Sequence, residues 1–487
     1  MTTPNKNEFI TNTLRLIFGN VGAQIINLLT IPIITRLYGP DSYGVLTLFL
    51  SVSSILVAIS CLRLETAILL PEKTEDAFSL FFLCLFFVFL FTFFVGGLSA
   101  IINCTTLQLP ESYNALTPYL YLVAGYIFLA GSYKAFSFIA VRQNYFTIQA
   151  VATVSNAGSN KLFSILYNVF FMDSPVGLIG GLIIGMFISC WMIIQYSLKE
   201  LSYFIVLINL KSVKKNFVRY KSFVIYSGTA FLESFSVELL PLMLGFLFSP
   251  AIVGFVGLTR RLMQQPLGVI GNAISRSFFQ KITEKHRSGN KYNTYVFDLF
   301  KHILIVTFIP VLLFSVISPE IFEVIFGVKW RTAGVYFSIL IIPFLTGFLY
   351  RPFSIIFDVQ EKQRFRFFFN ILKISFNFTA IYCGSFLLNS PVYALVFYSV
   401  TNTFITFIIM FLLMKMSGVT YSSLFTVIIK QIFIGIFLIF PILYLKFYIF
   451  SNNMVMFSII GITITGYLFY IFMNEPKLKM LFRSVIK

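Results

Sequence analysis

Long apolar stretches recur along this chain, and they set the strongest limit on its fold. A helix that crosses the hydrocarbon of a bilayer needs roughly 20 apolar residues at about 1.5 Å rise per residue, and by that measure we count about fourteen spans. They are predicted at residues 16–35, 43–62, 78–102, 116–141, 147–171, 176–196, 223–248, 251–275, 303–318, 333–357, 367–388, 392–414, 425–445 and 454–472. With 58% hydrophobic and only 11% charged residues, a soluble domain of 487 residues could not bury so much apolar surface. The sequence therefore predicts an all-α polytopic membrane protein.

The distribution of Lys and Arg predicts the orientation of the spans. An even number of spans puts both termini on one side, and basic residues concentrate on the cytoplasmic side. Most of the 36 basic residues fall on the side of the termini, most densely at 199–221 and 276–301. The opposite side holds Arg36, Lys329, Arg331 and Lys446. We expect both termini to be cytoplasmic, and the net charge of +18 to reflect topology rather than nucleic-acid binding.

A set of proline and glycine positions in the first two spans recurs in the seventh and eighth, 209 or 210 residues later. They are Pro32, Pro40 and Gly44, repeated as Pro241, Pro250 and Gly254. Residues 133–139 likewise resemble residues 350–356. Because an even number of spans separates the copies, we expect two six-helix lobes related by a pseudo-twofold axis along the membrane normal. The lobes are predicted at 1–201 and 222–416, with a basic cytoplasmic linker at 202–221 and an additional helix pair with a cytoplasmic tail at 417–487.

The eighth predicted span carries two arginines near its middle. Arg260 and Arg261 lie about ten residues, roughly 15 Å, from the outer end of their helix, which is too deep for easy snorkelling. Charges are costly in hydrocarbon, so this helix should face protein or a water-filled cavity. The amides of Gln264 and Gln265 follow in the same span. The arginines are candidates for binding an anionic substrate.

Two acids lie in the preceding span and offer another interpretation of the arginines. Glu233 or Glu238 could form a structural ion pair with Arg260 or Arg261, while the other arginine faces the cavity. Glu233 also stands at the repeat position of Gln24, so it is equally a candidate for carrying a coupling proton or ion. Both interpretations stay open at this point.

Further cations lie within other predicted spans. Lys161, near the middle of the fifth span, either lines a cavity or forms a local pair. Lys134 and Arg351 would be explained singly by snorkelling, but they occupy matching positions in the two repeats. That match favours two cations facing each other across the pseudo-symmetry axis. Arg63 and Glu65, at the cytoplasmic end of the second span, are interpreted as interfacial anchors of a helix end.

Polar residues on the first span complete a candidate cavity. Asn20, Gln24 and Asn27 recur at i, i+4 and i+7, which places them on one helix face. A cavity lined by cations, amides and hydroxyls suits a substrate that is anionic at one point and rich in hydroxyls elsewhere. Arginine matches phosphate oxygens with a planar fork, and Asn and Gln can match sugar hydroxyls. A pyrophosphate-linked oligosaccharide fits this description.

The sequence shows no catalytic pattern. The two histidines, His286 and His302, are far apart, and no HExxH, GxSxG or GxxxxGK motif occurs. The five cysteines lie in or beside apolar spans at no spacing typical of metal ligands. A membrane polymerase or ligase would also be expected to have a large outer loop, which this chain lacks. We therefore expect no catalysis, no cofactor, no metal and no disulfide.

Three groups of short motifs follow the order and spacing of a known family. They are Arg36-Leu37-Tyr38-Gly39-Pro40 with Tyr43-Gly44; Gly254, Arg261-Leu262, Pro266-Leu267, Ile270-Gly271 and Ala273-Ile274; and Phe326-Gly327, Trp330-Arg331 and Ala333-Gly334. Together they resemble the polysaccharide-biosynthesis flippases. The superfamily of these proteins also holds MATE multidrug exporters and peptidoglycan-lipid flippases.

The resemblance implies a bacterial inner-membrane flippase. Such a protein moves an undecaprenyl-diphosphate-linked sugar repeat unit from the cytoplasmic to the periplasmic leaflet, for O-antigen or capsule assembly. The implied mechanism is alternating access of two lobes, with the headgroup in a central cavity and the polyprenyl tail left in the membrane lipid. A polysaccharide polymerase and a chain-length regulator are the implied partners. The family usually has twelve spans, and the extra pair here resembles the peptidoglycan-lipid flippases, which leaves the subfamily open.

Other functions remain to be weighed against the flippase. A MATE-like exporter of organic cations, coupled to Na⁺ or H⁺, needs a cavity with net negative charge, whereas basic residues within these spans outnumber Glu233 and Glu238. A flippase for a peptidoglycan precursor would share the chemistry of the favoured substrate. A membrane scaffold for polymer assembly has no evident need for charges at the middle of the membrane.

Overall fold

The computed structural model describes residues 6–105, 108–207, 210–448, 458, 461–463 and 465–467. Nearly all of these residues are helical, and the chain divides into two compact units at Leu258 and Thr259. Among the described residues, eleven helical segments are long and apolar enough to cross a membrane. The prediction of an all-α polytopic membrane protein is confirmed.

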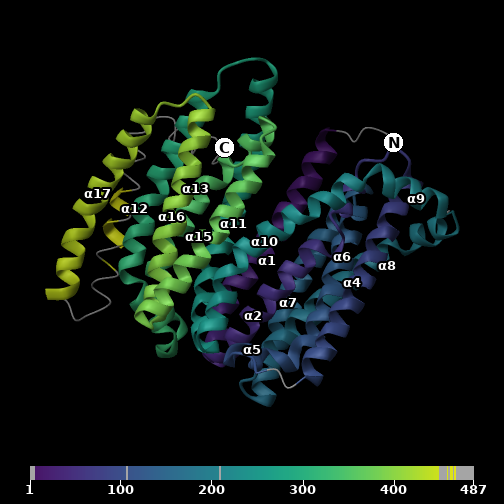
Figure 1. Cartoon of the computed structure of the whole chain (residues 1–487), viewed down its shortest axis with the longest axis horizontal. Helices are drawn as coiled ribbons and strands as arrows, with labels where there is room; N and C mark the ends of the chain where they lie inside the picture. Colours follow the sequence, from purple (N-terminus) through teal and green to yellow (C-terminus); the bar gives the residue numbers. More distant parts are fainter. Residues whose placement is uncertain are drawn as a thin grey trace. The chain divides into compact units, whose positions relative to one another are not determined.

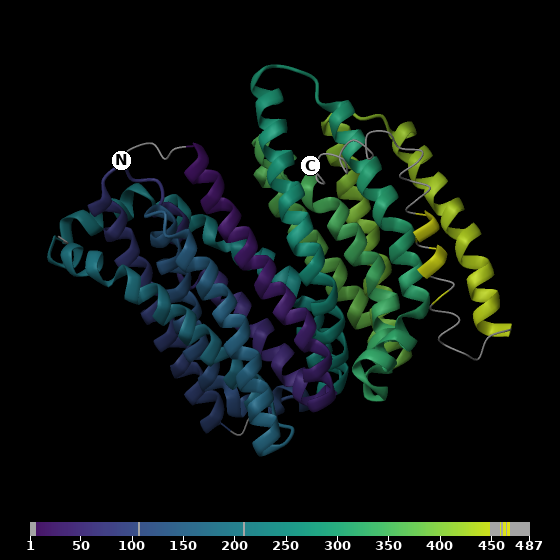
Figure 2. The same cartoon turned by 180° about the vertical axis from the view of Figure 1, so that it is seen from behind.

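The first unit is a bundle of long helices with short helices at their ends (Figures 1 and 2). Its helices are α1 (Lys6–Leu37), α2 (Pro40–Ser60), α3 (Leu64–Ala67), α4 (Thr74–Cys104), α5 (Glu111–Leu116), α6 (Leu120–Arg142), α7 (Phe146–Phe171), α8 (Pro175–Leu207), α9 (Leu210–Arg219) and α10 (Lys221–Leu247), with a 3-10 turn at Thr117–Tyr119. The most extensive pairings join α7 to α8 and α1, α4 to α6, and α2 to α10. Helix α11 (Pro250–Arg287) begins in this unit and ends in the second.

The second unit continues α11 and adds a further bundle. Its helices are α12 (Asn293–Phe326), α13 (Arg331–Phe353), α14 (Ile356–Val359), α15 (Gln363–Leu388), α16 (Pro391–Met416) and α17 (Tyr421–Tyr448), with a 3-10 turn at Val328–Trp330. Helix α12 packs on α13 and α17, and α16 packs on α13 and α15. Buried phenylalanines of α11, α12 and α13, including Phe278, Phe300 and Phe353, form its core.

Three of the about fourteen predicted spans are not among the eleven apolar segments. Residues 147–171 correspond to α7 and residues 251–275 to α11, which are long enough at 26 and 38 residues. Both helices carry more polar side chains: α7 contains several Asn, Ser and Thr residues beside Lys161, and α11 contains the two arginines and further polar residues. The last predicted span, 454–472, lies mostly outside the described residues. The predicted limits of the lobes and linker stay a prediction.

Prolines set the starts of four long helices. Helices α2, α8, α11 and α16 begin at Pro40, Pro175, Pro250 and Pro391. The first turn of a helix tolerates proline because its N–H groups have no partner within the helix, and the ring already has a helical φ. The sequence thus marks these boundaries directly.

The first turns of α2 and α11 cross at two glycines, both within the first unit. A Cβ atom on Gly44 would lie 1.9 Å from the carbonyl oxygen of Pro250, and one on Gly254 would lie 2.0 Å from that of Pro40. Only glycine fits, because the obstructing atoms are backbone. The residues that the repeat pairs in sequence therefore meet reciprocally in space.

The first family motif holds the turn between α1 and α2. The buried Tyr38 hydroxyl donates a hydrogen bond to the Ser164 carbonyl at 2.6 Å, and the Gly39 N–H donates to the Asp173 carboxylate at 2.8 Å. Burial, with a contribution from Asp173, raises the pKa of the Tyr38 phenol, so the hydroxyl stays a donor. These residues fix the turn against α7 and α8.

The third motif has an equally structural part in the second unit. Gly327 has a φ of 103°, which favours glycine, and Trp330 is fully buried. A Cβ on Gly334 would lie 2.5 Å from the Ser318 carbonyl oxygen, and the Ser318 hydroxyl donates to the Gly334 carbonyl at 2.9 Å. The close approach of α12 and α13 thus depends on a glycine.

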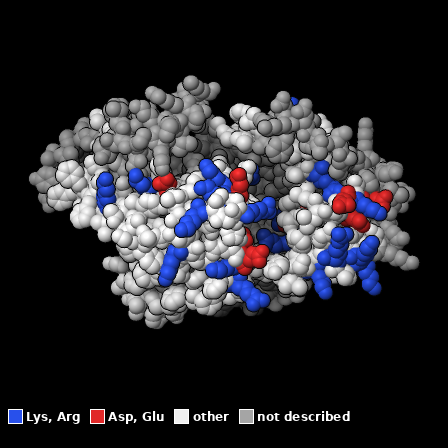
Figure 3. Space-filling view, turned by 90° about the horizontal axis from the view of Figure 1, so that it is seen from above, with Lys and Arg blue, Asp and Glu red and all other residues white. Residues whose placement is uncertain are grey.

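Basic side chains are prominent at one surface. Figure 3 shows more Lys and Arg than Asp and Glu on the face that it views. The last turn of α11 carries Lys285, His286 and Arg287, and Lys281 and Lys285 lie 4.9 and 5.8 Å from the ring centre of Tyr295. The last turns of α11 are therefore basic, and two of their lysines lie over an aromatic ring.

Candidate functional site

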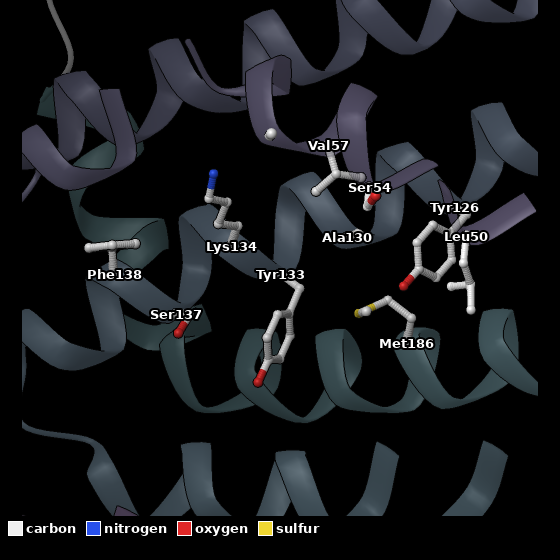
Figure 4. Close-up of a pocket in the computed structure, with 11 residues that line it drawn as sticks. Leu50, Ser54, Val57, Tyr126, Ala130, Tyr133, Lys134, Ser137, Phe138 and Met186 are labelled. Atoms are coloured by element: carbon white, nitrogen blue, oxygen red, sulfur yellow. The ribbon is translucent and has the colours of Figure 1, made fainter. Parts of the chain in front are cut away.

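A pocket of about 390 Å³ lies within the first unit, between α2, α6 and α8 (Figure 4). Its lining residues are Leu50, Ser54, Val57, Ala58, Tyr126, Ala130, Tyr133, Lys134, Ser137, Phe138 and Met186. The six residues from α6 recur at spacings of three and four, so one face of that helix forms most of a wall. Figure 4 shows Lys134 and Ser137 on α6, with Val57 and Ser54 of α2 across the pocket.

Lys134 is the only charged residue among those that line this pocket. Its Nζ atom lies 2.5 Å from Oε1 of Glu65, which follows the end of α2. The Lys134 side chain is 32% exposed, whereas that of Glu65 is 2% exposed. The ammonium group therefore stands between a buried carboxylate and the pocket.

Hydroxyl groups supply the remaining polarity of the pocket. Tyr126 and Ser137 come from α6 and Ser54 from α2, whereas the Tyr133 hydroxyl is hydrogen-bonded to Thr153 of α7. Gln149 of α7 donates to the Ser137 hydroxyl at 3.0 Å and to its carbonyl oxygen at 2.5 Å, which fixes that corner. A cation beside several hydroxyls can bind a group that carries negative charge and accepts or donates further hydrogen bonds.

The other candidates of the first unit do not line this pocket. Lys161 is buried within α7, at 5% exposure. Glu233 and Glu238 are half-buried on α10, and Glu238 accepts a hydrogen bond from the Ser51 hydroxyl of α2 at 2.9 Å. Ser51 lies one turn before Ser54 of the pocket, so Glu238 approaches the same helix.

The predicted polar face of α1 is partly covered. Asn20 is exposed, and Gln24 and Asn27 are half-buried where α1 packs on α7. The buried side-chain oxygen of Gln24 accepts no hydrogen bond from any residue that the structure describes. This face stays a candidate polar lining separate from the Lys134 pocket.

The cations of the second unit lie along two neighbouring helices. Arg260 of α11 is buried at 7% exposure, and Arg261 is half-buried. Further along α11, Gly271 lies against Arg351 of α13, since a Cβ there would be 3.5 Å from Arg351 Cδ. Arg351 itself is exposed. The structure thus brings Arg351 to the helix that carries the two arginines, about three turns away.

The two glutamines that follow the arginines differ in environment. Gln264 is exposed, and Gln265 is half-buried. The buried Oε1 of Gln265 has no hydrogen-bond donor among the described residues. Of this pair, Gln265 is the residue with an acceptor left for a further partner.

Glu65 is a candidate site residue that sequence reasoning missed. We interpreted it as an anchor at a helix end, but it is buried and pairs with Lys134. The second overlooked residue is Arg142, whose guanidinium donates to the carbonyls of Ile68 and Pro71 at 3.1 and 2.7 Å. Arg142 thereby holds the segment that carries Glu65 against the end of α6.

The sequence can be compared with known families now that the geometry is described. Residues 33–334, more than half of the chain, match a family described as polysaccharide biosynthesis protein. The chain belongs to this family. No curated protein sequence matches it. The matched region of this polysaccharide biosynthesis protein includes Glu65, Lys134, Arg260 and Arg261, whereas Arg351 lies beyond its end.

Solved structures share the fold of this polysaccharide biosynthesis protein. The lipid II flippase MurJ in an inward closed conformation is similar over 98% of this chain and 100% of its own, with a TM-score of 0.66 and 14% identity. An inward-facing multidrug resistance MATE family transporter of the MOP superfamily matches over 81% and 94%, with a TM-score of 0.56 and 14% identity. The eukaryotic MATE transporter AtDTX14 matches over 86% and 100%, with a TM-score of 0.51 and 14% identity. At such identities the likeness shows a common fold.

Proposed function

We propose that this protein is a flippase that carries a lipid-linked oligosaccharide diphosphate across the membrane by alternating access. The observation that carries the proposal is the Lys134 pocket, a cation among hydroxyls inside a membrane protein of a polysaccharide biosynthesis family. The fold shared with a lipid II flippase supports it. The proposal includes no catalytic step.

The chemistry of the pocket suits the headgroup of such a lipid. The ammonium of Lys134 offers three donors to phosphate oxygens. The hydroxyls of Tyr126 and Ser137 can hydrogen-bond to sugar hydroxyls. A charged headgroup pays a large desolvation penalty in hydrocarbon, of order 20 kcal/mol in the idealised limit. A cationic, hydroxylated cavity lowers that barrier by replacing part of the hydration shell.

The remaining cations are proposed to extend the headgroup path. Four further cations lie in helices that are predicted to cross the membrane, where a charge costs free energy unless it has a partner. They are Arg260, Arg261, Lys161 and Arg351. Arginine can bind a phosphate through two parallel hydrogen bonds, which would hold the diphosphate at another stage of transport. Glu233 and Glu238 are the candidates for coupling to an ion gradient.

The proposed direction is from the cytoplasmic to the periplasmic leaflet of a bacterial inner membrane. The substrate would be an undecaprenyl-diphosphate-linked repeat unit for O-antigen or capsule, and its polyprenyl tail would stay in lipid. A polysaccharide polymerase and a chain-length regulator are the proposed partners. A peptidoglycan precursor has the same diphosphate chemistry and is the nearest alternative substrate.

The function can be tested in a strain that lacks this gene and is complemented with variants. Lys134→Gln removes the pocket charge, and we expect it to lower surface polymer about tenfold or more, as loss of a buried charge contact of roughly 1.4 kcal/mol or more would do. Lipid-linked repeat units should accumulate at the cytoplasmic face. Lys134→Arg should retain part of the activity because it keeps the charge.

Lys329→Gln is the matched control, since Lys329 is an exposed lysine in the turn before α13. It should support wild-type levels of polymer. If the deletion strain instead keeps its surface polymer and becomes sensitive to cationic dyes, the protein is a MATE-like exporter and the flippase proposal is wrong. Accumulation of peptidoglycan precursor would identify that lipid as the substrate.

A further inference from the structure

After α2 the chain makes a strained turn that places the Glu65 side chain in the protein interior. Leu62 and Arg63 both adopt left-handed conformations, with φ of 50° and 58°, although neither is glycine. Such conformations are costly and persist only where the surroundings hold them. Here Arg142 binds the carbonyls that follow, and the Arg63 guanidinium lies 3.4 Å from the Thr229 hydroxyl. The turn is therefore held from both sides.

Only one of the two carboxylate oxygens of Glu65 has a partner among the described residues. Glu65 is 2% exposed, and its chain neighbours Leu64 and Ala67 belong to a cluster of buried apolar residues. Its Oε1 contacts Lys134, but its buried Oε2 accepts no hydrogen bond within the described part of the chain. Buried carboxylates usually have partners for both oxygens, and a buried ion pair without them gains little net stability. The pair is thus poorly optimised as a structural element.

The other partner of the pair is open to the pocket. Lys134 keeps 32% of its side chain exposed and lines the cavity with its hydroxyl neighbours. An ammonium group has three donors, and Glu65 provides an acceptor for one of them. The same cation can therefore serve a buried acid on one side and a ligand on the other.

We propose that Glu65 is the resident counter-ion of Lys134, and that an anionic headgroup enters the pocket by competing with Glu65 for this ammonium. This inference rests on the proposed flippase function and deepens it. In the empty pocket Glu65 neutralises the cation. A diphosphate offers more negative charge and more acceptors, so it draws the ammonium away from a carboxylate that holds it by one contact.

The exchange has a purpose in transport. A carrier must bind its substrate and also release it, so a cation that binds a diphosphate too firmly would slow each cycle. A carboxylate beside Lys134 favours release, because it can form the ion pair with the ammonium again as the headgroup leaves. Glu65 is accordingly a positioning residue that acts through Lys134, and its removal should strengthen binding.

The test measures binding of farnesyl diphosphate to the purified full-length protein in detergent, at fixed pH and salt, by titration calorimetry. Glu65→Gln should bind about tenfold more tightly than the wild type, since the competing charge is gone. Lys134→Gln should bind about tenfold more weakly. The double variant should resemble Lys134→Gln, because Glu65 acts only through that lysine. A purely structural pair would give weaker binding, or none, when either partner is removed.

The control is Glu323→Gln, which removes an acid from an ion pair with Arg331 on the second unit. It should bind like the wild type. Equal or weaker binding by a folded Glu65→Gln variant would overturn the inference and leave the flippase proposal intact. Should that variant fail to fold, Glu65→Asp keeps the charge but shortens its reach, and binding no tighter than the wild type would overturn the inference equally.

Failure of the proposed function gives a different result. If the wild-type protein binds farnesyl diphosphate no more tightly than farnesol, the pocket does not recognise a diphosphate. The flippase proposal then loses its central observation, and the counter-ion inference is overturned with it.

Discussion

At the scale of single residues, several members of the family motifs serve packing rather than recognition. Tyr38 and Gly39 fix the turn before α2, and Gly44 and Gly254 permit two helix ends to cross. None of them lines the Lys134 pocket. These motif residues therefore maintain the fold, whereas the proposed chemistry rests on the pocket residues.

The glycine crossing predicts the effect of one added methyl group. Gly44→Ala would place a Cβ 1.9 Å from the Pro250 carbonyl oxygen, and the obstructing backbone cannot rotate away. We expect a loss of about 1 to 3 kcal/mol in the free energy of unfolding, as for an overpacked core. Thermal unfolding in detergent measures it as a melting temperature lowered by a few degrees.

Gly125→Ala is the matched control, because no described atom outside its own helix turn lies within 4 Å of the added Cβ. It should leave the melting temperature unchanged or raise it slightly, since alanine favours a helix over glycine. Equal stability of Gly44→Ala and the wild type would show that α2 and α11 do not cross as closely as described.

The same scale shows how much of the site the sequence could predict. Lys134 and Arg260 could be found because a cation within an apolar stretch demands an explanation. Glu65 could not, since its burial depends on the left-handed backbone of Leu62 and Arg63, and neither residue type favours that conformation. Its partner also lies on a different helix, far away in sequence.

At the scale of elements, α9 shows how a basic segment is tied to the bundle. Asn216 is buried and donates to the Asp76 carboxylate of α4 at 2.8 Å, while the Phe217 ring lies 6.2 Å from that of Phe87. Lys214 and Lys215 point outward and are exposed. The composition predicts a basic linker at 202–221. The docking of this segment on α4 as an amphipathic helix could not be predicted, because it depends on which side chains of α4 face it.

The docking of α9 predicts a local change in dynamics. Asn216→Ala removes the donor to Asp76 and leaves a partly buried carboxylate without that partner, at a cost of about 1 to 3 kcal/mol. Amides within 210–219 should then exchange with deuterium about tenfold faster or more, because local opening is governed by this free energy. Lys214→Gln, on the exposed face, should leave exchange unchanged. Unchanged exchange in Asn216→Ala would mean that other contacts hold α9.

At the scale of the whole molecule, the apolar pattern of the sequence predicts the fold class correctly. It predicts the number of spans less well. Helices α7 and α11 correspond to predicted spans but are not among the apolar segments, because they carry amides and hydroxyls as well as Lys161, Arg260 and Arg261. Such helices are stable in a bilayer only when their polar faces meet protein or water. Hydropathy therefore misses two helices with polar faces, whereas the helices that line the Lys134 pocket are among those that it recognises.

The orientation in the membrane is the remaining prediction at this scale, and the chain carries a reporter for it. Cys104 is an exposed cysteine at the end of α4, on the side opposite to the termini in the predicted topology. A membrane-impermeant maleimide should label it in intact spheroplasts.

A Ser288→Cys variant made in a Cys104→Ser background should react only after permeabilisation, because the exposed Ser288 follows α11 on the basic, cytoplasmic side. The Cys104→Ser parent, made with Cys383→Ser because Cys383 is half-buried, sets the background, since Cys61, Cys84 and Cys190 are buried. The reverse labelling pattern would invert the topology, and the basic loops would then face the periplasm against the rule that orients most membrane proteins.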